Sequence, residues 1–236
     1  MIPHAINSGA ACAHLARAKC LFGLFFSAFL FAGCSALPDK PLRASLYDFG
    51  PGNLTAQPGT QPAIPNALPA LPALALDDIT TSGGALDNQA VLYRLTYLDA
   101  QQLRPYSQAR WAMPPAQLVR QRFREQLGQR RAIVDARGSL ALNRNQNTAL
   151  PLLLRLDLEE FSHVFTAPEA SVGLIRLRAT LIEQATSGEK LLAQRSMVVQ
   201  RPALTADAPG GVRALTAATD AAIEEIEVWL QQSRPR

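Results

Sequence analysis

A period-two alternation of apolar and polar residues runs through residues 150 to 200, and it constrains the fold more than any other feature. Successive side chains of a β-strand point to opposite faces of the sheet, so this pattern predicts strands packed on one side. Residues 150–161 predict one such strand, and residues 171–200 predict two more, joined as a hairpin at Ser187-Gly188. The apolar positions are Leu152, Leu154, Leu156 and Leu158, and then Ile175, Leu177, Ala179 and Leu181.

Two segments have the three-to-four-residue spacing of amphipathic helices. The first follows Pro114-Pro115, which suit a first helical turn, and Gly128 is placed to end it. Its apolar residues are Ala116, Val119, Phe123 and Leu127. The second covers residues 208–232, with a stripe made of Val212, Leu215, Thr219, Ala222, Ile226 and Trp229, and with Asp220, Glu224 and Glu227 on another side. The sequence therefore predicts an α+β fold: a mixed, largely antiparallel sheet with two amphipathic helices packed on one face.

Weaker signals predict the remaining elements. Short strands are expected at 46–51, around Leu74 and Leu76, and at 131–137, and a loop is expected at 80–89. In the strand expected at 90–99, the residues on one face are Val91, Tyr93, Leu95 and Tyr97, and those on the other are Arg94 and Thr96. Six prolines between 51 and 72 indicate a semi-extended linker or surface loop.

The N-terminal region has the order of an export signal. Arg17 and Lys19 precede an uncharged run of twelve residues, Leu21 to Ala32. A helix that crosses a bilayer needs about twenty predominantly apolar residues, so this run is too short for a comfortable span. A basic region, an apolar region and then small residues are typical of a signal peptide.

The run ends at Cys34, and here the stretch resembles the lipobox of bacterial lipoproteins, although Phe31 stands where that family usually has leucine. The resemblance implies removal of residues 1–33 and acylation of Cys34, which anchors the protein in a membrane. The alternative is a purely structural role, in which Cys34 is a buried residue of an N-terminal helix. This alternative does not explain the Pro-rich sequence that follows. Because Ser35 and not Asp follows the cysteine, the resemblance implies the periplasmic face of the outer membrane.

Cysteine usage and charge limit the function classes. The three cysteines are Cys12, Cys20 and Cys34, so a disulfide framework is excluded for the mature chain. The formal charge is +4, of which the leader carries two, and this is too little to indicate nucleic acid as a partner. We expect a signal peptide at 1–33, a lipidated tether at 34–45 and one α+β domain at 46–232 that contains the Pro-rich loop.

The sequence shows no constellation that would support catalysis. After His4 and His14 leave with the leader, His163 is the one remaining histidine, and no G-x-S-x-G or phosphate-binding loop accompanies it. We expect it to be an ordinary edge or turn histidine. The carboxylates Asp157, Glu159 and Glu160 could be interpreted as an acid pair for hydrolysis. Asp157 and Glu159 share the polar face of the strand, however, and pairing across strands with Arg176 and Arg178 is sufficient to explain them. We therefore expect no enzyme, no cofactor and no metal site.

Three stretches together resemble the ABC-type transport auxiliary lipoproteins, the group to which the PqiC-like proteins belong. They are "LYDFGP" at 46–51, "VLYRLTYLDAQQLRPYSQARWAMPPAQLVRQRFREQL" at 91–127 and "LRLDLEEFSHVF" at 154–165. The similarity covers roughly residues 44–232, its best marker is the stretch from Tyr106 to Pro115, and the Pro-rich tract is a departure that lengthens the tether. The resemblance implies a non-catalytic outer-membrane component of an MCE-type lipid-transport system, which docks the periplasm-spanning MCE protein and supports membrane integrity.

Seven residues are candidates for binding a partner: Tyr93, Arg94, Tyr106, Arg110, Trp111, Arg120 and Arg124. Tyr106 and Trp111 combine a large apolar area with a polar tip, which is typical of binding hot spots. The alternative is core packing, because a tryptophan before a helix commonly wedges that helix onto the sheet. Arg120 and Arg124, with Arg122, form either a solvated helix face or a contact for anionic lipid headgroups or an acidic partner.

Two functions from different classes stay open. The first is the docking module for an MCE protein, which would also guide phospholipid; the second is a structural or assembly lipoprotein that supports another periplasmic envelope complex. The sequence leaves open the cargo, its direction of travel, whether the domain touches lipid, and the oligomeric state, a homo-oligomer included.

Overall fold

The computed structural model describes residues 43–52, 71–136, 150–185 and 188–233. By its internal contacts the chain divides after Arg43, and Ala44–Arg236 form one unit, which is the unit described below. Cys34, the signal segment and most of the Pro-rich tract lie outside the described residues.

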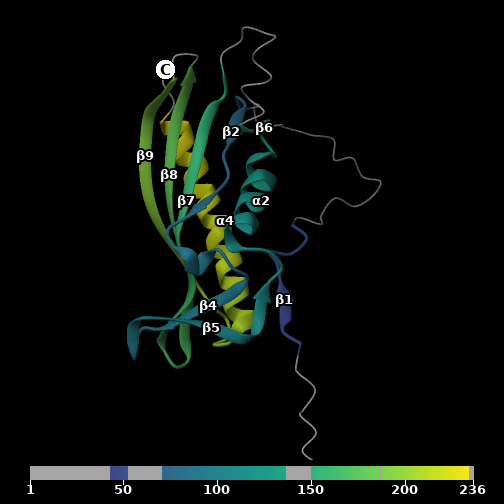
Figure 1. Ribbon diagram of the computed structural model, residues 1–236, viewed down its shortest axis with the longest axis vertical. Helices are drawn as coiled ribbons and strands as arrows, with labels where there is room; N and C mark the ends of the chain where they lie inside the picture. The colour runs from purple at the N-terminus through teal and green to yellow at the C-terminus, as the bar shows by residue number, and fades with distance from the viewer. Residues whose placement is uncertain (1–42, 53–70, 137–149, 186–187, 234–236) are drawn as a thin grey trace, which may run out of the picture. The chain divides into compact units, whose positions relative to one another are not determined.

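One long strand, β7, organises the sheet (Figure 1). Along one edge it pairs antiparallel with β8 over nearly its whole length. Along the other edge it pairs in parallel with three short strands, β2, β3 and β4. The bounds are β7 Leu152–Ala167, β8 Ala170–Ala185, β2 Leu74–Leu76, β3 Thr80–Thr81 and β4 Ala90–Leu95. The strands that pair with β7 are therefore placed by their register along it.

The remaining strands extend this sheet on both sides. Strand β9 pairs antiparallel with β8, and β5 pairs antiparallel with β4. Strand β1 adds in parallel to the end of β5, and β6 adds in parallel to β2. Their bounds are β9 Gly188–Pro202, β5 Asp99–Trp111, β1 Ser45–Tyr47 and β6 Ile133–Asp135. The predicted mixed, largely antiparallel sheet is confirmed.

Two helices cover one face of the sheet, as predicted (Figure 1). They are α2, Pro115–Leu127, and α4, Ala208–Gln232, and a short 3-10 helix, η1, covers Gly84–Leu86. The stripes of both helices share one apolar core with the inward side chains of β7 and β8. All ten helical residues expected on those stripes are buried. The packed face of the sheet is therefore the face that the sequence alternation indicates.

Local chemistry fixes the helix ends. Pro115 occupies the first turn of α2, and the helix ends at Leu127 with Gly128 as its C-cap, as expected. Helix α4 begins after Asp207, whose carboxylate accepts a hydrogen bond of 2.7 Å from the backbone N–H of Gly210. That contact satisfies one of the free N–H groups of the first turn.

Four local expectations need correction. Residues 99–111, for which the sequence pattern assigns no element, form the long strand β5. The strand expected at 46–51 ends at Tyr47, because the Asp48 carboxylate accepts a bond from the Gly50 N–H and the chain turns. The loop expected at 80–89 contains β3 and η1. The strand expected at 90–99 ends at Leu95, so Tyr97 lies in the following turn.

We predict that Gly173→Ala strongly destabilises the domain. A Cβ at Gly173 in β8 would lie 2.4 Å from backbone atoms of Ala214 and Leu215, so α4 would have to move off the sheet. Overpacking of this kind costs about 2–3 kcal/mol of the free energy of unfolding. Urea denaturation of the purified protein measures it. Gly84→Ala is the matched control, because no atom lies within 4 Å of its Cβ position; equal stability of the two variants would contradict the packing described.

Candidate functional site: a groove between the two helices

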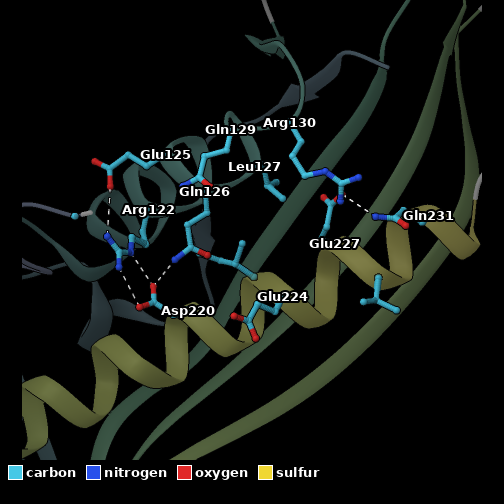
Figure 2. A pocket seen from close by; sticks show the side chains of 13 residues that line it. Arg122, Glu125, Gln126, Leu127, Gln129, Arg130, Asp220, Glu224, Glu227 and Gln231 are labelled. Atoms are coloured by element: carbon cyan, nitrogen blue, oxygen red, sulfur yellow. Dashed lines mark hydrogen bonds and ion pairs between the residues drawn. The ribbon is translucent and has the colours of Figure 1, made fainter. Parts of the chain in front are cut away.

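A groove of about 560 Å³ runs between α2 and the second half of α4 (Figure 2). Its walls carry both charges and amides, while Leu127, Ile223 and Val228 supply apolar surface. The polar lining residues are Arg122, Glu125, Gln126, Gln129, Arg130, Asp220, Glu224, Glu227 and Gln231. We call this site the α2–α4 groove.

At one end of the groove, Asp220 of α4 joins the two helices. Arg122 donates two hydrogen bonds to its carboxylate, at 2.7 and 3.0 Å, and Gln126 donates a third at 2.6 Å (Figure 2). The hydrogen bond to Asp220 raises the pKa of Arg122. A bidentate arginine–carboxylate pair has a defined geometry, so this end of the groove is fixed.

At the other end, a buried charge pair holds the chain after α2 against α4. The Arg131 side chain is fully buried, and its Nη2 lies 2.5 Å from Oε1 of Glu227. Gln231 donates to the same oxygen at 3.0 Å, one turn further along α4. Glu227 therefore neutralises a cation that has no access to solvent, and its loss would leave that cation unpaired.

The groove is lined mainly by charged and amide side chains. Its lining contains no histidine, cysteine, serine or threonine. In the described part of the chain, no group of three or more His, Cys, Asp or Glu side chains is arranged to hold a metal ion. The exposed Glu224 carboxylate and the polar ends of Glu125 and Gln129 remain on its rim.

A second polar cluster lies at the sheet, beside the first turn of α4. The Tyr106 hydroxyl lies 2.9 Å from Nδ1 of His163, and the Tyr93 and Tyr106 ring centroids are 4.6 Å apart. Burial raises the pKa of Tyr106, and the nearby Tyr93 and Asp207 add to this rise. A Cβ at Gly211 would lie 2.4 Å from Nδ1 of His163, so the imidazole packs against the helix backbone.

The expectation of an edge or turn histidine at 163 is wrong. His163 is fully buried within β7, where its neighbours are Tyr93 on β4 and Gly173 on β8. Burial lowers its pKa to about 4, against the opposing charge of Asp207. The residue is therefore a neutral core histidine at physiological pH.

The structure places Tyr93 and Arg94 side by side on β4 but in different surroundings. Tyr93 stacks in the cluster with Tyr106, whereas Arg94 forms a two-bond pair with Glu160, both bonds at 3.1 Å. Arg94 also donates to the carbonyls of Ala100 and Gln101, which ties β5 to β4 and β7. Of the expected cross-strand pairs, Arg178 with Glu159 is present, at 2.5 Å.

Arg110 and Trp111 lie at the end of β5. Trp111 is buried and contacts the rings of Phe49 and Phe161, at centroid distances of 5.7 and 5.6 Å. Arg110 donates to the Tyr106 and Ala109 carbonyls of its own strand. Trp111 is therefore packed in the core, which is one of the two alternatives, core packing and partner binding, that the sequence left open.

Arg120 and Arg124 lie on the other side of α2 from the groove. Both pair with Asp135 of β6, at 2.7 and 2.5 Å, and Arg120 also pairs with Asp78 at 3.2 Å. Although partial desolvation opposes ionisation, Arg124 and Arg120 lower the pKa of Asp135. These two arginines also line a further cleft of about 810 Å³ beside β3 and η1.

Sequence reasoning placed the acidic residues of α4 on a polar side but missed the groove that they form. The available signal was a complementary spacing: Arg122 and Gln126 are one turn apart on α2, and Asp220, Glu224 and Glu227 recur along α4. Helical periodicity identifies each polar side, whereas the meeting of the two sides depends on the angle between the helices.

Fold and site together define an α+β domain in which a charged groove lies between two helices that cover one sheet. The same fold occurs in protein XCC0632 from Xanthomonas campestris, with a TM-score of 0.55, 18% identity, and coverage of 70% of this chain and 87% of that one. It also occurs in a solved uncharacterized protein, with a TM-score of 0.53, 13% identity, and coverage of 80% and 99%.

The family model for the ABC-type transport auxiliary lipoprotein component matches residues 53–227. The chain belongs to this family, as the sequence resemblance indicated. A comparison with curated proteins gives no match. Among the described residues, no helix is both long and apolar enough to cross a bilayer.

We predict that acid destabilises the domain through His163. Its ordinary pKa is 6.5 and its folded pKa is about 4, so between these values the unfolded chain binds a proton that the folded chain does not. Above pH 6.5 His163 causes no loss of stability. As the pH falls from 6.5 to 4, the free energy of unfolding decreases by about 3 kcal/mol. Urea unfolding of the natural chain and of His163→Phe, at several pH values, measures it. Parallel stability curves would contradict the assignment.

We also predict that Glu227→Ala costs about 3 kcal/mol of the free energy of unfolding, because Arg131 would remain buried without its counterion. Glu224→Ala is the matched control, since this carboxylate lies one turn away and is exposed; its change should stay below about 0.5 kcal/mol. Thermal and urea unfolding compare the two. Similar losses in both variants would show that Glu227 has no special role.

Proposed function

We propose that this protein is an outer-membrane lipoprotein of an MCE-type lipid-transport system, anchored by acyl chains on Cys34, and that it docks the MCE protein. The observation that carries the proposal is the family match over residues 53–227, which makes the chain an auxiliary component of a transport system. The lipobox-like stretch before Cys34 supports the anchor. The α2–α4 groove, whose charges pair with one another across the two helices, supports a role by contact.

The arginine side of α2 is the surface proposed for docking. Arg120 and Arg124 are partly exposed, with 28% and 37% of their side-chain area accessible, and they border the cleft beside β3. Their partners Asp135 and Asp78 are more than half exposed, so these ion pairs contribute little to stability. An acidic segment of a partner can therefore replace them at small cost. Tyr106 and Trp111 are internal, and they would act by shaping the domain.

We predict that the double variant Arg120→Glu, Arg124→Glu loses the MCE protein. Detergent extraction of the tagged natural chain from its own envelope, followed by mass spectrometry of bound proteins and lipids, should identify an MCE-domain protein, and the variant should lose it. The melting temperature should fall only modestly, because the carboxylates that the substitutions bring beside Asp135 and Asp78 lie in a solvent-exposed region.

Controls separate docking from folding and from the alternative role. Arg176→Glu reverses one exposed charge on β8, which carries no proposed contact, and should retain the partner. Retention of the MCE protein by the double variant would remove this surface from the proposal. Recovery of another envelope complex without an MCE protein would overturn the proposed function in favour of a structural or assembly lipoprotein.

A further inference from the structure

One end of the domain exposes large apolar side chains without covering them. Leu98 is 67% exposed and Tyr97 is 42% exposed in the turn between β4 and β5, and Leu204 is 87% exposed in the segment before α4. Other large exposed apolar residues are spread over the sheet and the helices. We call this set of three residues the apolar end.

Hydrogen bonds place these two segments at the same end of the sheet. The Thr96 N–H and hydroxyl both donate to the carbonyl of Phe165, which fixes the β4–β5 turn beside the end of β7. The Ala203 N–H donates to the carbonyl of Ser171, which fixes the segment of Leu204 beside the start of β8. Strands β7 and β8 are joined by a short turn between these points, at the lower end in Figure 1.

The apolar end has a fixed backbone, and the residues around it carry charges of both signs. The Leu98 N–H donates to the Leu95 carbonyl at 2.9 Å, so the turn is closed by its own backbone. The charged residues nearby are of both signs, with Asp99 at the start of β5, Glu169 in the turn between β7 and β8, and Arg201 at the end of β9. A partner with charge of a single sign is therefore not favoured at this surface, whereas an apolar partner is favoured.

The first described residues of the chain run in the same direction as β5. Strand β1 is parallel to β5, with Ser45 opposite Ala109, and β5 starts at the exposed turn. The N-terminal end of β1 is therefore directed towards the side on which β5 starts. Cys34 stands eleven positions before Ser45, so an extended tether spans at most about 35–40 Å.

We propose that the apolar end inserts into the surface of the phospholipid bilayer that holds the acyl chains of Cys34. The inference rests on the proposed lipid anchor. Leu98 and Leu204 would enter the outermost hydrocarbon, and Tyr97 would lie at the headgroup level, where amphipathic rings collect. The tether keeps the domain near the bilayer, and the insertion fixes its orientation.

This orientation has a consequence for the groove. Helix α4 starts near the apolar end and runs away from it for 25 residues, about 37 Å. Glu227 and Gln231 are in its last turns, so the far part of the α2–α4 groove would face the periplasm. A partner that crosses the periplasm would then reach α2, which carries the arginine side proposed for docking, without entering the bilayer.

Fluorescent labels at single cysteines test the insertion. The natural cysteines are Cys12, Cys20 and Cys34, so an acylated mature chain has no other free thiol. Leu98→Cys and the matched control Val228→Cys, which is 55% exposed in the second half of α4, are labelled with an environment-sensitive dye in the full lipoprotein. The proteins are reconstituted into neutral phosphatidylcholine vesicles, with and without lipids that carry a quencher in their acyl chains.

We expect the label at 98 to shift its emission to shorter wavelength and to lose most of its intensity to the lipid quencher, while the label at 228 does neither. High salt should leave both results unchanged, since the contact is apolar. Co-flotation with intact vesicles and no quenching at 98 would overturn the insertion while the anchor stands. Failure to float would overturn the anchor, and the insertion with it. Protection of the label at 98 from a soluble quencher without lipid quenching would identify a protein interface instead.

Discussion

The pairing of β7 along both edges is the constraint on which the rest of the structure depends. One edge holds β8 in a long antiparallel ladder, and the other distributes β2, β3 and β4 in parallel along its length. Its inward residues, among them Leu154, Leu156 and Leu158, are completely buried under the helices. A shift of β7 by one residue would turn these leucines to the outer face and displace every strand that pairs with it. Both helices, and the groove between them, are thus positioned by the register of this one strand.

The domain separates polar binding chemistry from apolar exposure. The α2–α4 groove is lined by paired charges, and its geometry is held by Asp220 at one end and Glu227 at the other. The uncovered apolar side chains Tyr97 and Leu98 lie in the turn between β4 and β5. A protein that works by contact between a bilayer and a periplasmic partner needs both kinds of surface, and needs them apart.

The sequence predicts much of the fold because most of its core elements are periodic. Leu152 to Leu158, the hairpin at Gly188 and both helical stripes follow from alternation and spacing alone. Strand β5 escapes prediction because it is largely polar and contains Pro105; it is a strand because β4 and β1 pair with it. The burial of His163 could not be predicted, because the neighbouring residues in the sequence do not show that β4 and β8 pair with the two edges of β7. The groove could not be predicted, because it depends on how two helices meet. Arg120 and Arg124 could be predicted as part of a polar face. Their partners could not, because Asp78 lies in the segment between β2 and β3 and Asp135 is the last residue of β6.

The central claim is that a lipid anchor on Cys34 holds this domain at a membrane, where it acts by contact. Intact-mass analysis of the full chain purified from its native membranes tests that claim most directly. The account predicts a product that lacks residues 1–33 and carries the added mass of acyl chains at its N-terminal Cys34. A product that begins at Met1, or one whose Cys34 thiol is unmodified, would contradict it.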